Sequence, residues 1–151
     1  SGTPDPSVPI TALPIMSVIF FVAAVGEEIG WQGYAFEPLR TKWGMWGAGL
    51  GLGVVWAVWH IIPFVQTHNP IWWIVWQCVY TVTFRMIIGW GYTRTGNSIF
   101  AAVMLHATSN VAAFMTPNYG SGYNPLLATL FVSGFMVVIR LTTRRTLNAI
   151  A

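Results

Sequence analysis

Two adjacent glutamates, Glu27 and Glu28, stand inside the very apolar stretch FFVAAVGEEIGW. An ionisable side chain at membrane depth costs about 2.5–3.5 kcal/mol on insertion scales, so it needs a structural or chemical reason. A carboxylate held there can act as a general base that takes a proton from water. The alternative is that the first apolar helix ends at Gly26 and that both acids are solvated in the first turn of an interfacial helix.

Two histidines and an asparagine lie in other apolar segments. His60 stands among aromatic residues in WAVWHIIPF, and His106 precedes Asn110 by four residues in LHATSN. Residues four apart share one face of a helix, so this imidazole and carboxamide can point at one reacting atom. The alternatives are a core or interface role for His60 and interhelical hydrogen bonds for His106 and Asn110.

Several other catalytic centres are excluded by missing residues. The chain contains no HExxH zinc signature, no GxSxG, no Walker A motif and no GxGxxG. Asp5 is the only aspartate, so a di-aspartyl intramembrane protease is excluded. The groups that remain for chemistry are the glutamates, two histidines and one asparagine inside apolar segments.

The elements that hold these groups are expected to be membrane helices. Of the 151 residues, 55% are hydrophobic and 7% charged, and the mean hydropathy is +0.61. Soluble domains carry roughly 25% charged residues, so a water-soluble globule is excluded. A disordered chain is excluded because nine Trp, nine Phe and five Tyr supply more apolar surface than such chains contain. The net charge of +3 does not indicate nucleic-acid binding, because the seven basic residues are scattered along the chain. The sequence predicts an all-α, polytopic transmembrane helical bundle.

Prolines, glycines and capping residues divide the apolar sequence into five expected spans of about 20 residues each. These spans cover residues 14–37, 43–62, 71–89, 98–115 and 125–140. The expected ends of the first two are Pro38 and Pro63, and the expected caps of the last three are Asn69, Asn97 or Ser98, and Asn124. Overlapping GxxxG patterns in the second span predict the close approach of another helix. The glycines concerned are Gly47, Gly49, Gly51 and Gly53.

Five spans place six basic residues on the same side of the membrane, which makes that side cytoplasmic. They are Arg40, Lys42, Arg94, Arg140, Arg144 and Arg145. The expected organisation is a linker at 1–12, a membrane core at 13–145 and a cytoplasmic tail at 146–151. The linker has neither an initiator Met nor signal-peptide features, so we expect a fragment of a longer protein that holds the core motifs.

Three motifs, each in an apolar span, together resemble the CPBP family of CAAX prenyl proteases and bacteriocin-processing or immunity proteins. The matching segments are EEIGWQ (27–32) for Glu-Glu-x-x-x-Arg, WAVWH (56–60) for aromatic-x-x-x-His, and HATSN (106–110) for His-x-x-x-Asn. The preceding TRTGNS segment is similar to the bacterial branch. The resemblance covers residues 17–115 and implies an intramembrane protease core.

The resemblance also implies a role for each polar residue. Glu27 would be the base that activates water, with His60 as its partner. His106 and Asn110 would stabilise the oxyanion of the tetrahedral intermediate. Imidazole and carboxamide N–H groups donate to developing negative charge, which agrees with this division. The mechanism requires no metal or other cofactor.

One position departs from the family pattern, because Gln32 stands where the motif has Arg. A neutral amide beside two acids requires a compensating positive charge or proton nearby. Arg85 is the only basic residue well inside a span, and we predict that it pairs with Glu28 directly or through Gln32. The alternative is that Arg85 snorkels to the cytoplasmic interface.

The leading functional prediction is an intramembrane endopeptidase that cleaves membrane-associated peptides or proteins by Glu-activated water. A first alternative, favoured by Gln32, is a non-catalytic membrane scaffold or bacteriocin-immunity protein of the same fold. A second is a zinc-dependent membrane protease with Glu27, His60 and His106 as ligands of a divalent metal. In each case we expect a multi-pass protein of the bacterial cell membrane, surrounded by lipids and without a nucleic-acid partner.

Overall fold

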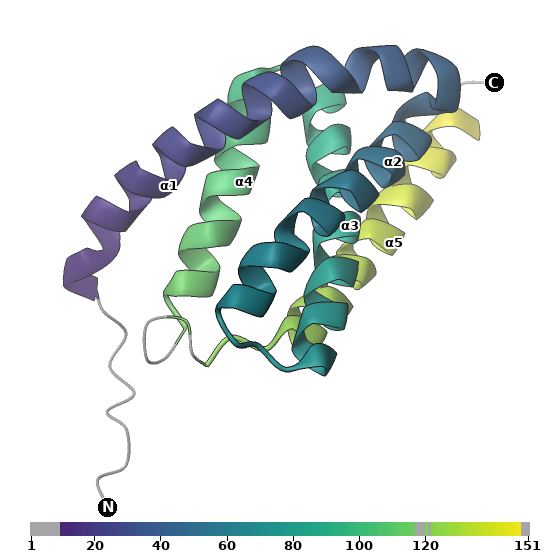
Figure 1. Cartoon of the computed structure of the whole chain (residues 1–151). Helices are drawn as coiled ribbons and strands as arrows, with labels where there is room; N and C mark the ends of the chain where they lie inside the picture. Colours follow the sequence, from purple (N-terminus) through teal and green to yellow (C-terminus); the bar gives the residue numbers. More distant parts are fainter. Residues whose placement is uncertain (1–9, 117–119, 121, 149–151) are drawn as a thin grey trace, which may run out of the picture. The chain divides into compact units, whose positions relative to one another are not determined.

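The computed structural model describes residues 10–116, 120 and 122–148, with side chains as far as residue 142. Residues 1–9 of the expected linker and 149–151 of the expected tail therefore lie outside the described residues. The described part of the chain is helical and contains no strand, which confirms the all-α prediction (Figure 1). Its elements are η1 (Ile10–Ala12), α1 (Leu13–Glu28), the π-helix η2 (Ile29–Phe36), α2 (Glu37–Gln66), α3 (Ile71–Arg94), α4 (Ile99–Phe114) and α5 (Pro125–Asn148).

The ends of the first two helices differ from the sequence-based expectation. Pro38 does not end the first helix, because α1 continues through η2 into α2. The wider turns of a π-helix leave room ahead of a proline ring, which otherwise clashes with the carbonyl four residues earlier. The chain breaks instead at Gly44, whose φ of 71° and ψ of 172° suit a residue without a Cβ. Pro63 also lies inside α2, which ends three residues later at Gln66.

Two of the predicted caps are confirmed and one is wrong. The Ser98 hydroxyl accepts a hydrogen bond from the N–H of Ala101 at 3.2 Å, and Asn124 Oδ1 accepts from the N–H of Leu126 at 3.0 Å. Asn69 does not cap the start of α3. Its amide donates to the carbonyl of Phe64 at 3.2 Å and thereby satisfies an acceptor at the end of α2.

Three helical segments are long and apolar enough to cross a membrane. They are Ile10–Gln66, Ile71–Arg94 and Pro125–Thr142, and Ile99–Phe114 forms a shorter apolar helix. The break at Gly44 divides the first segment into two helical parts. With this division the segments correspond to the five expected spans, so the chain is a multi-pass membrane protein.

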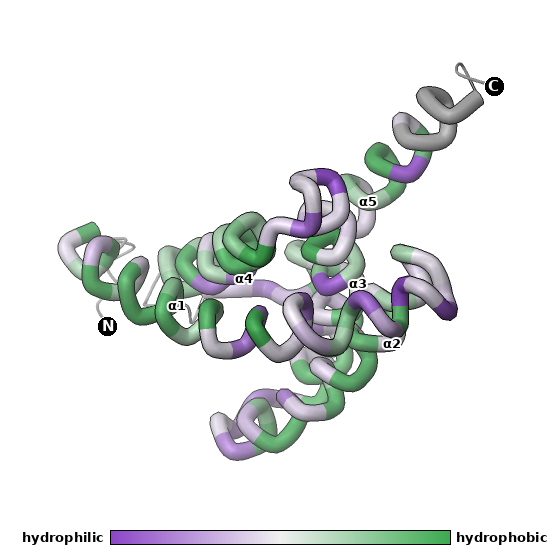
Figure 2. Tube along the Cα trace, turned by 90° about the horizontal axis from the view of Figure 1, so that it is seen from above, coloured by the Kyte–Doolittle hydropathy of each residue, from purple (hydrophilic) through white to green (hydrophobic). Residues whose placement is uncertain are grey.

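The chain forms two compact units, each described here by itself. The first contains residues 1–49 and 88–123, and the second contains residues 50–87 and 124–151. In the first unit α1 packs beside α4, and hydrophobic residues cover most of both helices (Figures 1 and 2). Small side chains bring these helices close together: Ala24 of α1 meets Val103 and Ala107 of α4, with Phe21 and Val25 packed against them.

In the second unit a glycine sets the distance between α2 and α3. A Cβ added to Gly53 would lie 2.9 Å from both the Cα and the carbonyl oxygen of Val82, closer than atoms can approach. The close approach expected from the GxxxG patterns is therefore present at this position. Thr129 of α5 donates a hydrogen bond to the carbonyl of Trp76 in α3 at 3.1 Å.

The distribution of polar residues is the reverse of that in a soluble protein. Large hydrophobic side chains such as Val18 and Val22 are 63% exposed, whereas Glu28, Gln32 and Arg85 have no exposed surface. Exposed hydrocarbon is suited to lipid, and buried polar groups in such a protein mark a functional interior. The site is therefore to be sought among these buried residues.

Candidate active site

The first unit contains a buried contact between an acid and an imidazole. Glu28 Oε1 lies 2.8 Å from His106 Nδ1, although the two residues are 78 positions apart in the sequence. The side-chain exposure is 0% for Glu28 and 2% for His106. Glu28 is the last residue of α1 and His106 lies in the middle of α4, so the small-residue packing of these helices brings the two groups together.

This contact fixes the chemistry of the His106 ring. A carboxylate accepts hydrogen bonds, so Nδ1 carries the proton that faces Glu28. Nε2 lies on the opposite side of the ring from this contact. An imidazole held by a carboxylate in this way has a defined orientation and tautomer, as a residue that binds water or an oxyanion requires.

A π-helix begins directly after Glu28. Its eight residues, Ile29–Phe36, include Gln32, which has no exposed surface. Neither Nε2 nor Oε1 of Gln32 has a hydrogen-bond partner among the residues that the structure describes. An unsatisfied buried polar group costs about 1–3 kcal/mol, and π-helical turns are frequent at functional sites. Gln32 is thus a buried polar residue with an unsatisfied amide in the described residues, four positions after Glu28.

The other two predicted residues of the first unit lie next to this pair. Glu27 is partly exposed, and its neighbour Glu28 is buried. The side chains of consecutive helical residues differ by about 100° in direction. The carboxylates of Glu27 and Glu28 therefore do not contact the same partner in the same way. Asn110 lies one turn after His106 on α4 and is also partly exposed. The assignment of Glu27 as base and Asn110 as oxyanion donor stays a prediction.

In the second unit His60 is held by its own helix. Its Nδ1 lies 2.9 Å from the carbonyl oxygen of Trp56, which can only accept, so Nδ1 carries the proton and Nε2 has a free lone pair. Three aromatic rings surround the imidazole. Their centroids lie 5.2 Å away for Trp56, 4.8 Å for Trp59 and 5.6 Å for Phe64.

Arg85 does not snorkel to the membrane surface, because it has no exposed surface at all. Its guanidinium carbon lies 3.9 Å from the centre of the Trp56 ring, within the second unit. Glu28 and Gln32 belong to the first unit, so the predicted pairing of Arg85 with Glu28 stays a prediction. The same holds for the convergence of His60 with Glu27 and with the other site residues.

Sequence reasoning missed two features of the site. It paired Glu28 with Arg85 and did not predict the hydrogen bond between Glu28 and His106. No spacing rule links residues on separate helices. It named Trp56 only as the aromatic position of a motif. The four-residue spacing of Trp56, His60 and Phe64 on one helix is the signal that could have predicted the aromatic surroundings of the histidine.

No group of three His, Cys, Asp or Glu side chains that could hold a metal ion occurs in the described ranges. The predicted zinc ligands Glu27 and His106 belong to the first unit and His60 to the second.

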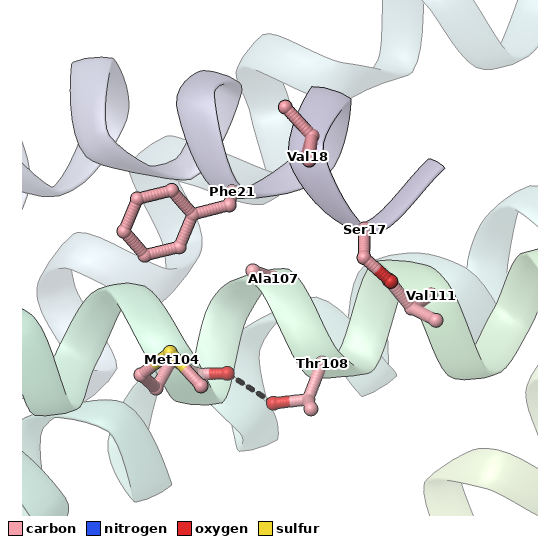
Figure 3. Close-up of a pocket in the computed structure, with 7 residues that line it drawn as sticks. All are labelled: Ser17, Val18, Phe21, Met104, Ala107, Thr108 and Val111. Carbon is pink, nitrogen blue, oxygen red and sulfur yellow. Dashed lines mark hydrogen bonds between the residues drawn. The ribbon is translucent and has the colours of Figure 1, made fainter. Parts of the chain in front are cut away.

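An apolar groove of about 350 Å³ runs beside the site, between α1 and α4. Ser17, Val18 and Phe21 line it from α1, and Met104, Ala107, Thr108 and Val111 line it from α4 (Figure 3). The Thr108 hydroxyl bonds to the carbonyl of Met104, so it is satisfied within its own helix (Figure 3). The groove therefore presents mainly hydrocarbon, and its lining residues on α4 lie on both sides of His106 in the sequence.

Comparison with known proteins identifies a matching family and a similar protein. The family described as type II CAAX prenyl endopeptidase Rce1-like matches residues 9–112, a range that contains all four predicted catalytic residues. The chain is similar to CAAX prenyl protease 2 of Methanococcus maripaludis, with 27% identity over 108 residues. The alignment covers 66% of this chain and 39% of that relative, so the chain spans less than half of its length. No solved structure matches the chain.

Proposed function

Because the chain belongs to the type II CAAX prenyl endopeptidase Rce1-like family, we propose that it is an intramembrane endopeptidase that uses Glu27 to activate water. The observation that carries the proposal is the buried contact of Glu28 with His106 among apolar helices. Burying these two polar side chains costs desolvation free energy. A protein can retain such a contact because it orients the imidazole for catalysis.

In the proposed reaction water attacks the carbonyl carbon of a peptide bond while its proton passes to Glu27. His60 is the proposed partner of this base. His106, through an imidazole N–H, and Asn110, through its amide, donate to the oxyanion. The C–N bond then breaks, and the proton held by Glu27 passes to the leaving nitrogen. Glu28 positions His106, and no metal or other cofactor takes part.

The proposed substrate is a membrane-associated peptide or protein, approached through surrounding lipid. The apolar groove beside His106 is suited to a hydrocarbon part of such a substrate. The relative's name specifies a CAAX prenyl protease, so a peptide that ends in a prenylated cysteine motif is one candidate and an unprenylated apolar peptide is the other. The TRTGNS segment supports placement in a bacterial cell membrane.

Peptide cleavage by the chain in proteoliposomes tests the proposal. Glu27→Gln and His106→Ala should abolish turnover, and Asn110→Ala should lower it by roughly 10²–10³, the usual cost of one oxyanion donor. Glu37→Gln is the matched control, because the Glu37 carboxylate pairs with Arg40 at 2.7 Å and is about one-third exposed. Turnover retained by Glu27→Gln would overturn the assignment of the base.

Gln32 supports a second candidate function. Its buried amide atoms lack partners among the described residues, and it replaces the basic residue of the motif. A protein that has lost catalysis but kept the fold would act as a membrane scaffold or a bacteriocin-immunity protein. Absence of cleavage with either class of peptide, together with intact folding, would favour this candidate.

A further inference from the structure

A buried cation in the second unit lies beside the aromatic residues around His60. Arg85 has no exposed surface, and its guanidinium carbon is 3.9 Å from the centre of the Trp56 ring. A cation over an indole is attracted to the ring more strongly when it is removed from water. The contact therefore restricts the indole as well as the arginine.

The close approach of α2 and α3 makes this contact possible. Gly53 lies one turn before Trp56 and faces the α3 backbone, where an added Cβ would be 2.9 Å from Val82 and 3.3 Å from Arg85 Cβ. A larger residue at Gly53 would separate the helices. The close approach of the two helices at Gly53 thus allows the Arg85 guanidinium to contact the Trp56 ring.

Trp56 in turn contacts His60 in two ways. Its indole meets the imidazole edge to face, with an interplanar angle of 86°, and its carbonyl accepts the Nδ1 proton at 2.9 Å. The first contact limits rotation of the ring. The second keeps Nε2 free of a proton in the neutral tautomer.

A second contact with α3 supports the other side of the imidazole. Phe64 stacks on His60 with an interplanar angle of 28°, and Trp73 of α3 meets Phe64 edge to face at 5.4 Å. Trp56 and Phe64, which flank His60 along α2, thus each contact a residue of α3. Trp56 contacts Arg85, and Phe64 contacts Trp73.

We infer that Arg85 is a positioning residue for His60 and that it acts through the Trp56 ring. This inference rests on the proposed function, because it gives the orientation of His60 a catalytic purpose. Arg85 does not need to touch substrate. Its removal takes away one contact that holds the indole in place, and a misplacement of about 1 Å at a catalytic group can cost 10²-fold in rate.

The test combines kinetics with histidine NMR on the chain in micelles. The variants are Arg85→Met, the conservative Arg85→Lys, and Arg94→Met as a matched control on the same helix. A His68→Gln background leaves only the ring signals of His60 and His106. We expect Arg85→Met to shift or broaden the His60 ring signals, to leave those of His106 in place, and to lower kcat 10- to 100-fold with KM within twofold.

Arg85→Lys should restore part of both effects, because it returns a cation to the indole without the planar guanidinium. Should Arg85→Met fail to fold, Trp56→Phe is measured instead, since it weakens the cation contact while keeping an aromatic ring and the backbone carbonyl. Unchanged His60 signals in a folded variant would overturn the inference. Absence of turnover in the unsubstituted chain would instead overturn the proposed function, and the NMR result would still decide whether Arg85 orients the His60 ring.

Discussion

The contact between Glu28 and His106 predicts a large and non-additive effect on stability. His106→Leu replaces the imidazole by an apolar side chain, so the Glu28 carboxylate loses its Nδ1 donor inside the protein. Breaking a buried ion pair on one side costs about 3–5 kcal/mol, whereas neutral hydrogen bonds between membrane helices average about 0.6 kcal/mol and reach about 1.7. The contact is 2.8 Å long and its two side chains are at most 2% exposed. For a charged pair buried in this way we expect a loss of about 3–5 kcal/mol.

The double variant Glu28→Leu with His106→Leu should recover most of that loss. Replacement of a buried pair by apolar residues of similar volume is often neutral or stabilising, because no desolvated charge remains. The assay is equilibrium unfolding in mixed micelles of increasing SDS content, followed by circular dichroism. A double-mutant cycle then gives the interaction energy directly, and it requires no enzymatic activity.

Glu37 and Arg40 provide the matched control. Their contact is 2.7 Å long, but the side chains are 35% and 33% exposed and lie three residues apart on one helix. Screening and side-chain entropy reduce such a pair to less than about 1 kcal/mol, so Arg40→Leu should change stability little. A loss below about 1.7 kcal/mol for His106→Leu would refute a charged pair and leave a neutral interhelical hydrogen bond. Additive effects in the cycle would refute the contact itself.

Three other predictions concern Gln32, Gly53 and metal dependence. Gln32→Leu should raise the free energy of unfolding by about 1–3 kcal/mol, because it removes a buried donor and acceptor without partners in the described part of the chain; a decrease in the same SDS titration would show that the amide is hydrogen-bonded in the membrane. Gly53→Ala should lower the free energy of unfolding by about 1–3 kcal/mol through overpacking. Gly26→Ala, where no atom lies within 4 Å of the new Cβ, should not lower it, and equal losses would contradict the close helix approach. Chelation should leave peptide cleavage unchanged, whereas a loss restored by zinc would favour the zinc-protease alternative.

Much of the fold could be predicted from local sequence properties. Hydropathy and charge indicate membrane helices because each span must bury its backbone polar groups in its own hydrogen bonds. Ser98 and Asn124 cap the expected helices because a cap involves only the next three residues. The CPBP-like motifs predicted the family because their residues lie within single helices, where spacing determines which side chains share a face.

The failures occur where a second element decides the outcome. Pro38 and Pro63 remain within helices, since a π-helix or packing can accommodate a missing N–H that a local rule treats as a stop. Asn69 bonds to the preceding helix because the turn brings the carbonyl of Phe64 within 3.2 Å. Neither result follows from residue preference alone.

The polar residues of the site were predictable as a set, but their partners were not. An acid or imidazole inside an apolar span is recognisable from sequence because its burial is costly wherever the helix packs. The Glu28 contact with His106, by contrast, depends on how α1 crosses α4, and the Arg85 contact with Trp56 depends on how closely α3 approaches Gly53. Sequence periodicity determines which face of one helix a residue occupies, whereas only the packing of two helices determines which side chain it meets.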